Sequence, residues 1–349
     1  MDTAGIDTGY SLMKTATPDG KVHVEPTACA LITIAADGFS IGNSTAGRIT
    51  LSREDGKHTF LVGEHAASAE YRLETKSPDW VLGLQWQAVT MYGLCQAFQD
   101  NEIDIGVAVV ALPQSDIGLG AKLAARLVGR HSLNVDGKAR SITIHNCVPV
   151  SQPYAGLCDF ALGKDGGTKR NAFAEDYALI VDVGSRTMHV QPTHKMSLDA
   201  MRGLARDFGL FGALENIATD IRRKYDLNPS LPEITRWMQT GRLMVRGQSI
   251  PIGPISGPHL YPLLEVVINL MERIESPAKF NAVGLVGGGM AALLTIVDGN
   301  GKPELCKMIA KRFAEPTIAA DPVGACALGA HKIARYLAGS VANGKSHNS

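Results

Sequence analysis

The alternation of hydrophobic and polar residues predicts that the first half of the chain opens with paired strands. Residues 16–24, 32–41 and 50–63 each place Asp-Gly between β-prone runs. Asp-Gly favours a tight hairpin because both central positions of such a turn tolerate a positive φ. We therefore expect a hairpin in each of these segments.

Longer apolar patterns predict helices and a buried strand after the hairpins. Within residues 80–98, Leu84, Ala88 and Met91 recur at helical spacing. Residues 103–112 are mostly apolar and end at Pro113, which is typical of a buried strand. A second helix is expected around residues 118–130, and a further Asp-Gly hairpin over residues 132–150.

The second half of the chain repeats this mixture of strands and helices. The Gly-, Lys- and Asp-rich residues 161–176 predict a loop at or near a domain boundary. A strand–turn–strand is expected over 176–192, mainly helices from 198 to about 274, and a strand over 281–289 that leads into a helix from Met290. The last helix is expected at about 321–337, followed by a flexible polar tail over 338–349.

Length and composition narrow the classes of protein. A chain of 349 residues with 45% hydrophobic residues predicts two domains with packed cores. The 34 basic and 34 acidic side chains balance, which argues against a protein that coats DNA through bulk charge. The first residues lack the pattern of a signal peptide. Residues 280–297 are better explained by a strand, a loop and a helix than by a membrane span. The 6 cysteines show no C-x-x-C spacing. We therefore expect a cytoplasmic protein with reduced thiols and no membrane partner.

Two short motifs, GIDTGYS at residues 5–11 and IVDVGSRT at residues 180–187, indicate a duplication. Each has a strand, then Asp, one residue, Gly and a nearby hydroxyl. The aspartates, Asp7 and Asp182, are 175 residues apart, close to half of the chain, as a duplicated two-domain architecture requires. A single D-x-G is a common turn, so the duplication is inferred from the two motifs together and not from either one alone.

A strand that ends in Asp and turns through Gly suits phosphate binding. The Gly lets the backbone approach a ligand, and successive N–H groups can point at an anion. The Asp is suited to hold the waters of a Mg²⁺ ion. Lys14, expected on the returning strand, would neutralise phosphate charge, although taken alone it is more simply a solvated strand lysine. Two such hairpins facing each other would hold a triphosphate and its metal from both sides.

The glycine-rich segments have competing interpretations. Residues 283–290, VGLVGGGM, place three glycines between a buried strand and a helix, which would make a floor for a flat or anionic ligand. The match of Gly287 to Ala292 to a Rossmann-like G-x-G-x-x-A lacks the acidic strand end expected about 20 residues later, so we reject it. Residues 339–346, GSVANGKS, match the P-loop pattern, but a helix precedes them and none can follow to carry the Lys and Ser beneath the phosphates.

With these motifs in this order, the sequence resembles an actin-fold ATPase. The resemblance is greatest to the ParM/StbA group of bacterial actin-like proteins and their archaeal relatives, and it covers nearly the whole chain. The segments that carry it are GIDTGYSLMK, FLVGEHAA, VVALPQ, VSQPYAG, IVDVGSRT, VGLVGGGM and DPVGACALGA.

The resemblance implies an α/β fold of the duplicated actin-like (ribonuclease H-like) kind, with a nucleotide in the cleft between two domains. Residues 1–155 would form domain I, completed by the C-terminal helix at about 321–337. Residues 156–320 would form domain II.

The resemblance also implies ATP, or GTP, bound together with Mg²⁺. Asp7 and Asp182 would orient the water shell of the metal, and Gln152 would orient the attacking water. The first phosphate loop would consist of Thr8, Gly9, Tyr10 and Ser11, and Lys14 would reach the terminal phosphates. The second phosphate loop would consist of Gly184, Ser185 and Thr187. Glu215 would approach the ribose, and Gly287, Gly288 and Gly289 would lie against the adenosine.

Several positions depart from the family pattern. Arg186 stands where relatives often have a small residue, and Cys326 replaces a frequent Asn. Gln152 stands where relatives have Glu or Gln, and an amide is a poor base. Positioning and electrostatics can still suffice, because phosphoryl transfer depends mainly on them.

The function implied by the resemblance is an ATP-dependent, filament-forming protein that segregates plasmid DNA. Its partners would be further copies of itself and an adaptor protein bound to the DNA. Two alternatives stay open: a small-molecule kinase of the same superfold, and a non-polymerising regulatory or scaffolding ATPase. Light scattering after addition of ATP would distinguish a filament-forming protein from these two alternatives.

Overall fold

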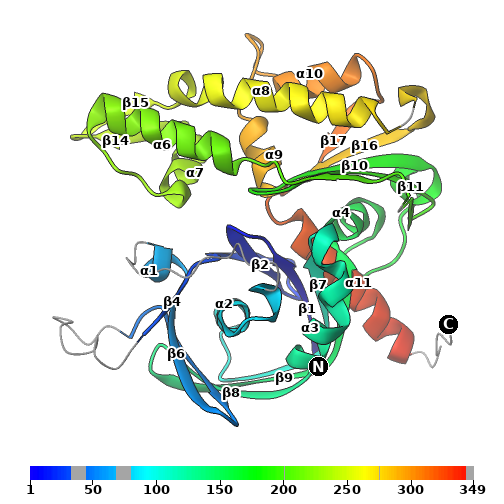
Figure 1. Cartoon of the computed structure of the whole chain (residues 1–349). Coiled ribbons are helices and arrows are strands. Elements are labelled where there is room, and N and C mark those ends of the chain that lie inside the picture. Colours follow the sequence, from blue (N-terminus) through cyan, green and yellow to red (C-terminus); the bar gives the residue numbers. More distant parts are fainter. Residues whose placement is uncertain (33–44, 68–79, 200, 275, 343–349) are drawn as a thin grey trace. The chain divides into compact units, whose positions relative to one another are not determined.

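The computed structural model describes residues 1–32, 45–67, 80–199, 201–274 and 276–342 (Figure 1). The hairpin predicted over residues 32–41 lies outside this part of the chain. The structure divides into two compact units. Unit 1 comprises Met1–Ala155, Leu162–Gly167 and Ala327–Ser349, and unit 2 comprises Gly156–Ala161 and Thr168–Cys326. The short segment Leu162–Gly167, expected in domain II, therefore clusters with the first unit.

Unit 1 is built on a mixed sheet. Its described strands follow the order β3-β2-β1-β7-β9-β8-β5-β6-β4, in which β1, β7 and β9 are parallel and the outer pairings are antiparallel. The predicted Asp-Gly hairpins are confirmed as β2–β3, β5–β6 and β8–β9. The strands are β1 (Asp2–Thr8), β2 (Leu12–Ala16), β3 (Val22–Pro26), β4 (Cys29–Leu31), β5 (Arg48–Arg53), β6 (Gly56–Val62), β7 (Glu102–Leu112), β8 (Gly129–Val135) and β9 (Lys138–Ser151).

Helix α2 (Leu84–Phe98) fills the concave side of this sheet, which curves around it in Figure 1. The helix ends where Gln99 takes a left-handed conformation with φ 61°. Of the predicted helical stripe, Ala88 and Met91 are fully buried in the core of unit 1, and Leu84 is half-buried against it. The other helices of the unit are α1 (Glu64–Ala67), η2 (Trp80–Leu82), η3 (Gln114–Leu119), α3 (Gly120–Leu127) and most of α11 (Ala325–Ala342).

The last helix, α11, packs directly on the first strand. A Cβ at Gly5 of β1 would collide with the Ala327 carbonyl oxygen and the His331 backbone, so only glycine allows this approach. The hydroxyl of Thr3 lies 3.0 Å from Nε2 of His331. Burial, and next the nearby charge of Arg335, lower the pKa of His331 to about 4. The two sequence ends of unit 1 are therefore packed directly against each other.

Unit 2 is built on a smaller sheet with the described order β12-β11-β10-β16-β17, and β13 pairs beside β11. The strand–turn–strand predicted over 176–192 is confirmed as β10–β11. The strands are β10 (Tyr177–Val183), β11 (Met188–His194), β12 (Ser197–Leu198), β13 (Leu204–Arg206), β16 (Ala282–Val286) and β17 (Pro316–Ile318).

Helices supply the rest of unit 2, and α6, α7 and α8 pack their apolar faces into one core with the sheet. Helix α4 begins in unit 1 and ends in unit 2. The helices are α4 (Gln152–Ala161), α5 (Ala172–Glu175), α6 (Phe211–Tyr225), α7 (Leu231–Thr240), α8 (Gly253–Glu272), η4 (Pro277–Lys279), α9 (Gly288–Leu293) and α10 (Glu304–Ala310).

Some sequence expectations were wrong in detail. Helices dominate residues 198–274 as expected, but β14 (Arg242–Val245) and β15 (Gln248–Pro251) form an unexpected hairpin there, whose turn residues, Arg246 and Gly247, have φ values of 48° and 79°. Helix α9 begins at Gly288 rather than at Met290.

The last helix also differs from its expected range. Residues 321–324 form a turn, so α11 begins only at Ala325. It continues to Ala342, so the first part of the expected tail, residues 338–342, is helical. The hydroxyl of Ser340 donates to the Tyr336 carbonyl at 2.9 Å, which lets this polar residue sit inside the helix.

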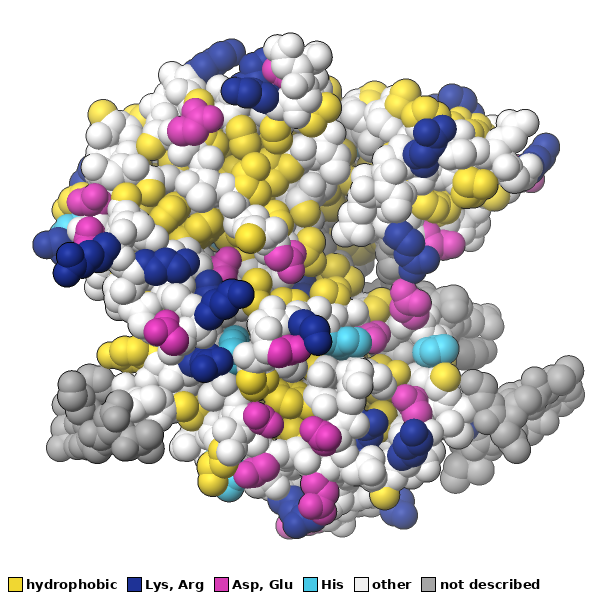
Figure 2. Space-filling model, turned by 180° about the vertical axis from the view of Figure 1, so that it is seen from behind, with side chains coloured by type: hydrophobic (Ala, Val, Ile, Leu, Met, Phe, Trp, Pro, Cys, Tyr) yellow, Lys and Arg dark blue, Asp and Glu magenta, His cyan; other side chains and the backbone are white. Residues whose placement is uncertain are grey.

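Basic and acidic side chains are interspersed over the face drawn in Figure 2. In the described ranges, no helix combines the length and the apolar character that crossing a membrane requires.

Candidate functional site

The β1–β2 hairpin of unit 1 holds a buried group of polar side chains. Asp7 on β1 faces Lys14 across the hairpin, and Lys14 Nζ lies 2.8 Å from Asp7 Oδ2. Gln152, the first residue of α4, donates its Nε2–H to Asp7 Oδ1 at 2.7 Å. The exposed fractions of the three residues are 3%, 7% and 8%. Asp7, Lys14 and Gln152, which the sequence analysis assigned to one site, therefore do lie together.

The turn of this hairpin depends on Gly9. A Cβ at Gly9 would lie 2.6 Å from the Leu12 carbonyl oxygen and 2.9 Å from Lys14 Nζ. Thr27 fixes the turn from β3's side, because its hydroxyl donates to the Gly9 carbonyl at 2.7 Å and its N–H to the Ser11 carbonyl at 2.8 Å. The loop expected to bind phosphate is thus held in a single tight shape.

Two side chains of the loop contact other elements of unit 1. The hydroxyl of Thr8 donates to the Ala111 carbonyl on β7 at 3.1 Å. The hydroxyl of Tyr10 donates to Asp116 Oδ2 at 3.3 Å, and its ring lies 5.8 Å from that of Trp80. These two side chains fasten the hairpin to its surroundings, and a role in binding phosphate stays a prediction.

The β10–β11 hairpin of unit 2 has a related arrangement. Asp182 on β10 faces His189 on β11, and Asp182 Oδ2 lies 3.7 Å from His189 Nδ1. The Gly184 N–H donates to the Thr187 carbonyl at 2.8 Å, which closes the turn. The Phe211 N–H donates to the Ser185 carbonyl at 2.7 Å, so the turn is tied to the start of α6. Arg186 is half-buried in this turn.

The triple-glycine loop lies against this second hairpin. Gly287 has φ 105°, and a Cβ there would collide with the Val183 carbonyl oxygen and with Asp182 Oδ1. A Cβ at Gly289 would lie 2.6 Å from the Gly184 carbonyl oxygen. At Gly288, by contrast, a Cβ would meet no atom within 4 Å. The structure therefore brings the glycine loop, Asp182 and the second turn together, as expected.

Other expected residues lie around this loop. The Gly287 N–H donates to the Pro322 carbonyl at 2.7 Å, so the DPVGACALGA segment contacts the glycine loop through its backbone. Cys326 in that segment is a buried free thiol. Glu215 is exposed on α6, one turn after Phe211, and its approach to the ribose stays a prediction.

His189 is a residue of this site that the sequence motifs did not single out. It follows Asp182 by seven residues, as Lys14 follows Asp7, and both pairs face each other across their hairpins. His189 is 3% exposed, and its Nδ1 has no hydrogen-bond partner among the described residues. The equal spacing in the two motifs was the signal that could have identified it.

The chemistry of Asp7, taken within unit 1, is compatible with a magnesium ion held through water. An ionised carboxylate offers about four acceptor positions, so Asp7 can accept from water as well as from Lys14 and Gln152. Within the described ranges, no three His, Cys, Asp or Glu side chains gather into a direct metal site. Mg²⁺ commonly keeps several waters and needs only one or two carboxylates, which matches this donor set.

Comparisons with known proteins identify the fold of the chain. Residues 5–154 match the family described as "Actin like proteins N terminal domain". The archaeal actin homolog Ta0583, solved in complex with ADP, superposes with a TM-score of 0.71 over 96% of this chain and 100% of its own, at 18% identity. The chain has an actin-like fold. The resemblance stated from the sequence and the α/β fold class are thereby confirmed.

Other structures share the actin-like fold. The actin-like protein Alp7A superposes with a TM-score of 0.77 over 98% of both chains, at 16% identity. ParM is represented by a 15-stranded filament from Clostridium botulinum, with a TM-score of 0.69, 15% identity and coverage of 96% and 99%. ParM from Bacillus thuringiensis, solved with ATP, has a TM-score of 0.69, 14% identity and coverage of 97% and 99%. No curated protein matches the chain.

Proposed function

We propose that the protein is a Mg²⁺-dependent ATPase that assembles into filaments and segregates plasmid DNA through an adaptor protein. The observation that carries this proposal is the repeated hairpin. In each unit a buried aspartate is the last residue but one of a strand, β1 or β10, a glycine turn follows, and a polar side chain faces the aspartate from seven residues on. Tight glycine turns of this kind can present successive backbone N–H groups to an anion, which supports the proposal.

Different residues would bind the phosphates, the adenosine and the metal ion. Lys14 and the backbone of residues 8–11 and 184–187 would bind the phosphates. Gly287, Gly288 and Gly289 would lie against the adenosine; the absence of any atom within 4 Å of a Cβ at Gly288 among the described residues supports this role. Bound Mg²⁺ would neutralise charge on the phosphate oxygens, and Asp7 and Asp182 would orient its waters.

Gln152 would position the attacking water rather than remove its proton. Its Nε2–H is donated to Asp7 at 2.7 Å, so the orientation of the amide is fixed. The competing explanation, that Gln152 only caps a helix that begins near Pro153, is weaker, because α4 begins at Gln152 itself and the amide reaches β1. A fixed amide suits phosphoryl transfer, which relies on positioning.

Assembly and cargo rest on analogy with the relatives. ParM of Clostridium botulinum forms a filament, and ParM of Bacillus thuringiensis binds ATP. The even charge balance of this chain favours an adaptor over direct contact with DNA.

The test combines light scattering with phosphate release in ATP and Mg²⁺. We expect the unmodified protein to scatter after ATP is added and to lose scattering as phosphate is released. Asp182→Asn should abolish hydrolysis, and Gln152→Ala should slow it by about tenfold or more, roughly 1.4 kcal/mol of barrier, with nucleotide affinity kept within a few-fold.

The matched control is Gln87→Ala, which also removes an amide that makes a hydrogen bond, to Arg53 at 2.9 Å on the surface. It should leave hydrolysis unchanged. Unchanged phosphate release with a lowered melting temperature in Gln152→Ala would remove Gln152 from the catalytic group. A protein that neither binds nor hydrolyses ATP would overturn the proposed activity.

A further inference from the structure

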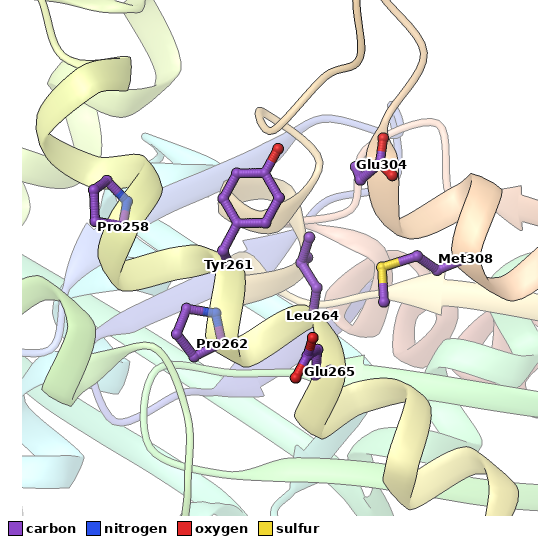
Figure 3. Close-up of a pocket in the computed structure, with 7 residues that line it drawn as sticks. All are labelled: Pro258, Tyr261, Pro262, Leu264, Glu265, Glu304 and Met308. Atoms are coloured by element: carbon purple, nitrogen blue, oxygen red, sulfur yellow. The ribbon is translucent and has the colours of Figure 1, made fainter.

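A groove on unit 2 lies between α8 and α10 (Figure 3). Its volume is about 390 Å³, within the range of about 300–1,000 Å³ typical of binding pockets. Tyr261, Leu264 and Met308 line it, and Tyr261 is 51% exposed although it is a large aromatic side chain. Pro258 and Pro262, both within α8, complete its wall. An exposed and mostly apolar groove favours contact with another molecule.

Two carboxylates give this groove a negative edge. Glu265 comes from α8 and Glu304 from α10. Glu304 lies 3.6 Å from Lys307, which also pairs with Asp298 at 2.9 Å. Glu265 is exposed and pairs with no cation in the part of the chain that the structure describes. The groove therefore offers an apolar floor beside an uncompensated negative charge.

The β14–β15 hairpin of the same unit carries positive charge beside an exposed apolar side chain, whereas the groove carries negative charge. Leu243 and Val245 are buried and fix the hairpin to the core of unit 2, while Met244 points to the other face and is 57% exposed. The turn at Arg246 and Gly247 has positive φ values at both positions, the tight kind of turn that holds two strands in register. The hairpin thus presents Met244 on a preformed support.

Two arginines flank that methionine. Arg242 donates to Ser249, through Nε to the hydroxyl at 2.6 Å, and Arg246 follows at the turn. Neither arginine pairs with a carboxylate among the described residues. Methionine and arginine are both over-represented at the centres of protein interfaces, since one adapts to apolar gaps and the other makes forked hydrogen bonds to carboxylates.

We propose that the β14–β15 hairpin of one copy binds in the α8–α10 groove of a second copy. Met244 fills the apolar floor beside Tyr261 and Met308, and the arginine at the turn pairs with Glu265. This inference deepens the proposed function and rests on it, because it names the contact through which copies would assemble.

The hairpin and the groove are different surfaces, so the contact between two copies is not self-complementary. After one hairpin is bound, the pair still has one free groove and one free hairpin, and a third copy can add at either end. A head-to-tail contact of this kind gives a ring or an open helical filament, whereas a self-complementary contact would stop at a dimer. The proposal therefore predicts a polymer from a single interface.

The test measures the protein concentration required for assembly with ATP and Mg²⁺, by sedimentation of the full chain. Met244→Asp, Arg246→Glu and Glu265→Arg should each raise this concentration by about tenfold or more, equivalent to about 1.4 kcal/mol per contact. Combining Arg246→Glu with Glu265→Arg in one chain reverses the charges on both sides and should restore assembly to within a few-fold of the unmodified protein.

Control variants change similar side chains elsewhere. Met201→Asp alters a methionine that is 95% exposed, and Lys138→Glu reverses a cation beside the β8–β9 turn. Both should assemble like the unmodified protein. Nucleotide affinity and melting temperature should be unchanged in every variant, which separates a lost interface from a misfolded chain.

Direct contact is tested by mixing a Met244→Cys protein with a Tyr261→Cys protein during assembly. We expect a disulfide-linked pair of chains from the mixture and little from either protein alone. If the unmodified protein assembles and the three single variants assemble equally well, this inference is wrong and the proposed function stands.

If the variants lose assembly but neither charge reversal nor the cross-link supports the contact, another occupant uses the groove and the inference is again overturned. If the unmodified protein stays monomeric with ATP at tens of micromolar, the proposed assembly fails and this inference fails with it.

Discussion

Replacing Lys14 with methionine tests how strongly the first hairpin depends on its buried ion pair. The side chains of Lys14 and Asp7 are 9% and 4% exposed, and their charged atoms lie 2.8 Å apart. Methionine is similar in length but carries no charge. In Lys14→Met, the Asp7 carboxylate would stay buried beside the amide of Gln152 without its cation.

The expected cost is large for a single substitution. Removing one partner of a buried ion pair typically costs about 3–5 kcal/mol, because the other charge is left uncompensated. For a unit of this size each kcal/mol lowers the melting temperature by about 2–4 °C, so a fall of about 6–20 °C is expected. Lys14→Met combined with Asp7→Asn should lose much less, because replacing both charges by neutral groups is often close to neutral.

The assay is chemical and thermal unfolding of the unmodified chain, both single variants and the double variant. Two of the three tryptophans, Trp80 and Trp86, lie in unit 1, and Trp237 lies in unit 2. Carrying out the series in a Trp237→Phe background makes the fluorescence report on unit 1 alone. The four free energies of unfolding then give the coupling between the two charges.

Lys21→Met is the matched control. Lys21 also lies 2.8 Å from an aspartate, Asp19, but those side chains are 85% and 51% exposed. Its loss should leave the melting temperature unchanged, because exposed pairs contribute little. The reasoning is refuted if Lys14→Met costs less than about 1 kcal/mol, or if the double variant loses as much as the two single variants added together.

Three further perturbations follow from the structure. Gly287→Ala should lower the melting temperature of the protein, because φ is 105° there, whereas Gly288→Ala should keep it and weaken nucleotide binding in calorimetry; equal stability of both variants would contradict the geometry. The pKa of His331 falls from 6.5 to about 4 on folding, so the unfolded chain binds the proton more tightly and stability should decline as pH drops from about 6.5 towards 4. His331→Gln should flatten that part of a plot of melting temperature against pH, and an unaltered slope would rule His331 out as its source. His189→Leu removes a buried nitrogen without a partner, so the melting temperature should hold or rise while phosphate release slows; a fall of several degrees would show that the imidazole is needed for packing.

Local patterns in the sequence were sufficient to predict the hairpins. Asp19-Gly20 and Asp136-Gly137 each lie at the turn of an antiparallel pair, because the residue preference of such turns is set by backbone sterics alone. The pairing of Asp7 with Lys14 follows from the same local rule, since a short turn brings residues at this spacing face to face.

The contact between Gln152 and Asp7 could not be predicted from local patterns. It exists because β1, β7 and β9 are parallel neighbours whose carboxyl ends meet at one edge of the sheet, which places the start of α4 beside the end of β1. That order depends on pairings between segments more than 90 residues apart in sequence. The resemblance to a known family suggested a shared site, but only the sheet order gives the hydrogen bond.

The β14–β15 hairpin was missed for a different reason. Its turn is Arg246-Gly247, and arginine seldom takes a positive φ, so the sequence carried no strong turn signal. Burial of Leu243 and Val245 on one face compensates for that local cost. Tertiary packing therefore decided the structure of this segment.

The contact of α11 with Gly5 has a consequence for how the protein is made on the ribosome. The strand β1 emerges first, but the helix that covers it begins at Ala325, after nearly all of unit 2 has been translated. At about 5–20 residues per second, the 170 residues between Ala155 and Ala325 take roughly 10–35 s to synthesise. During that interval the nascent chain carries an uncovered apolar sheet face, which is a natural target for a chaperone. Unit 2 is complete in sequence only at Cys326, just as α11 begins, so unit 1 gains the helix that covers β1 only after unit 2 has been translated.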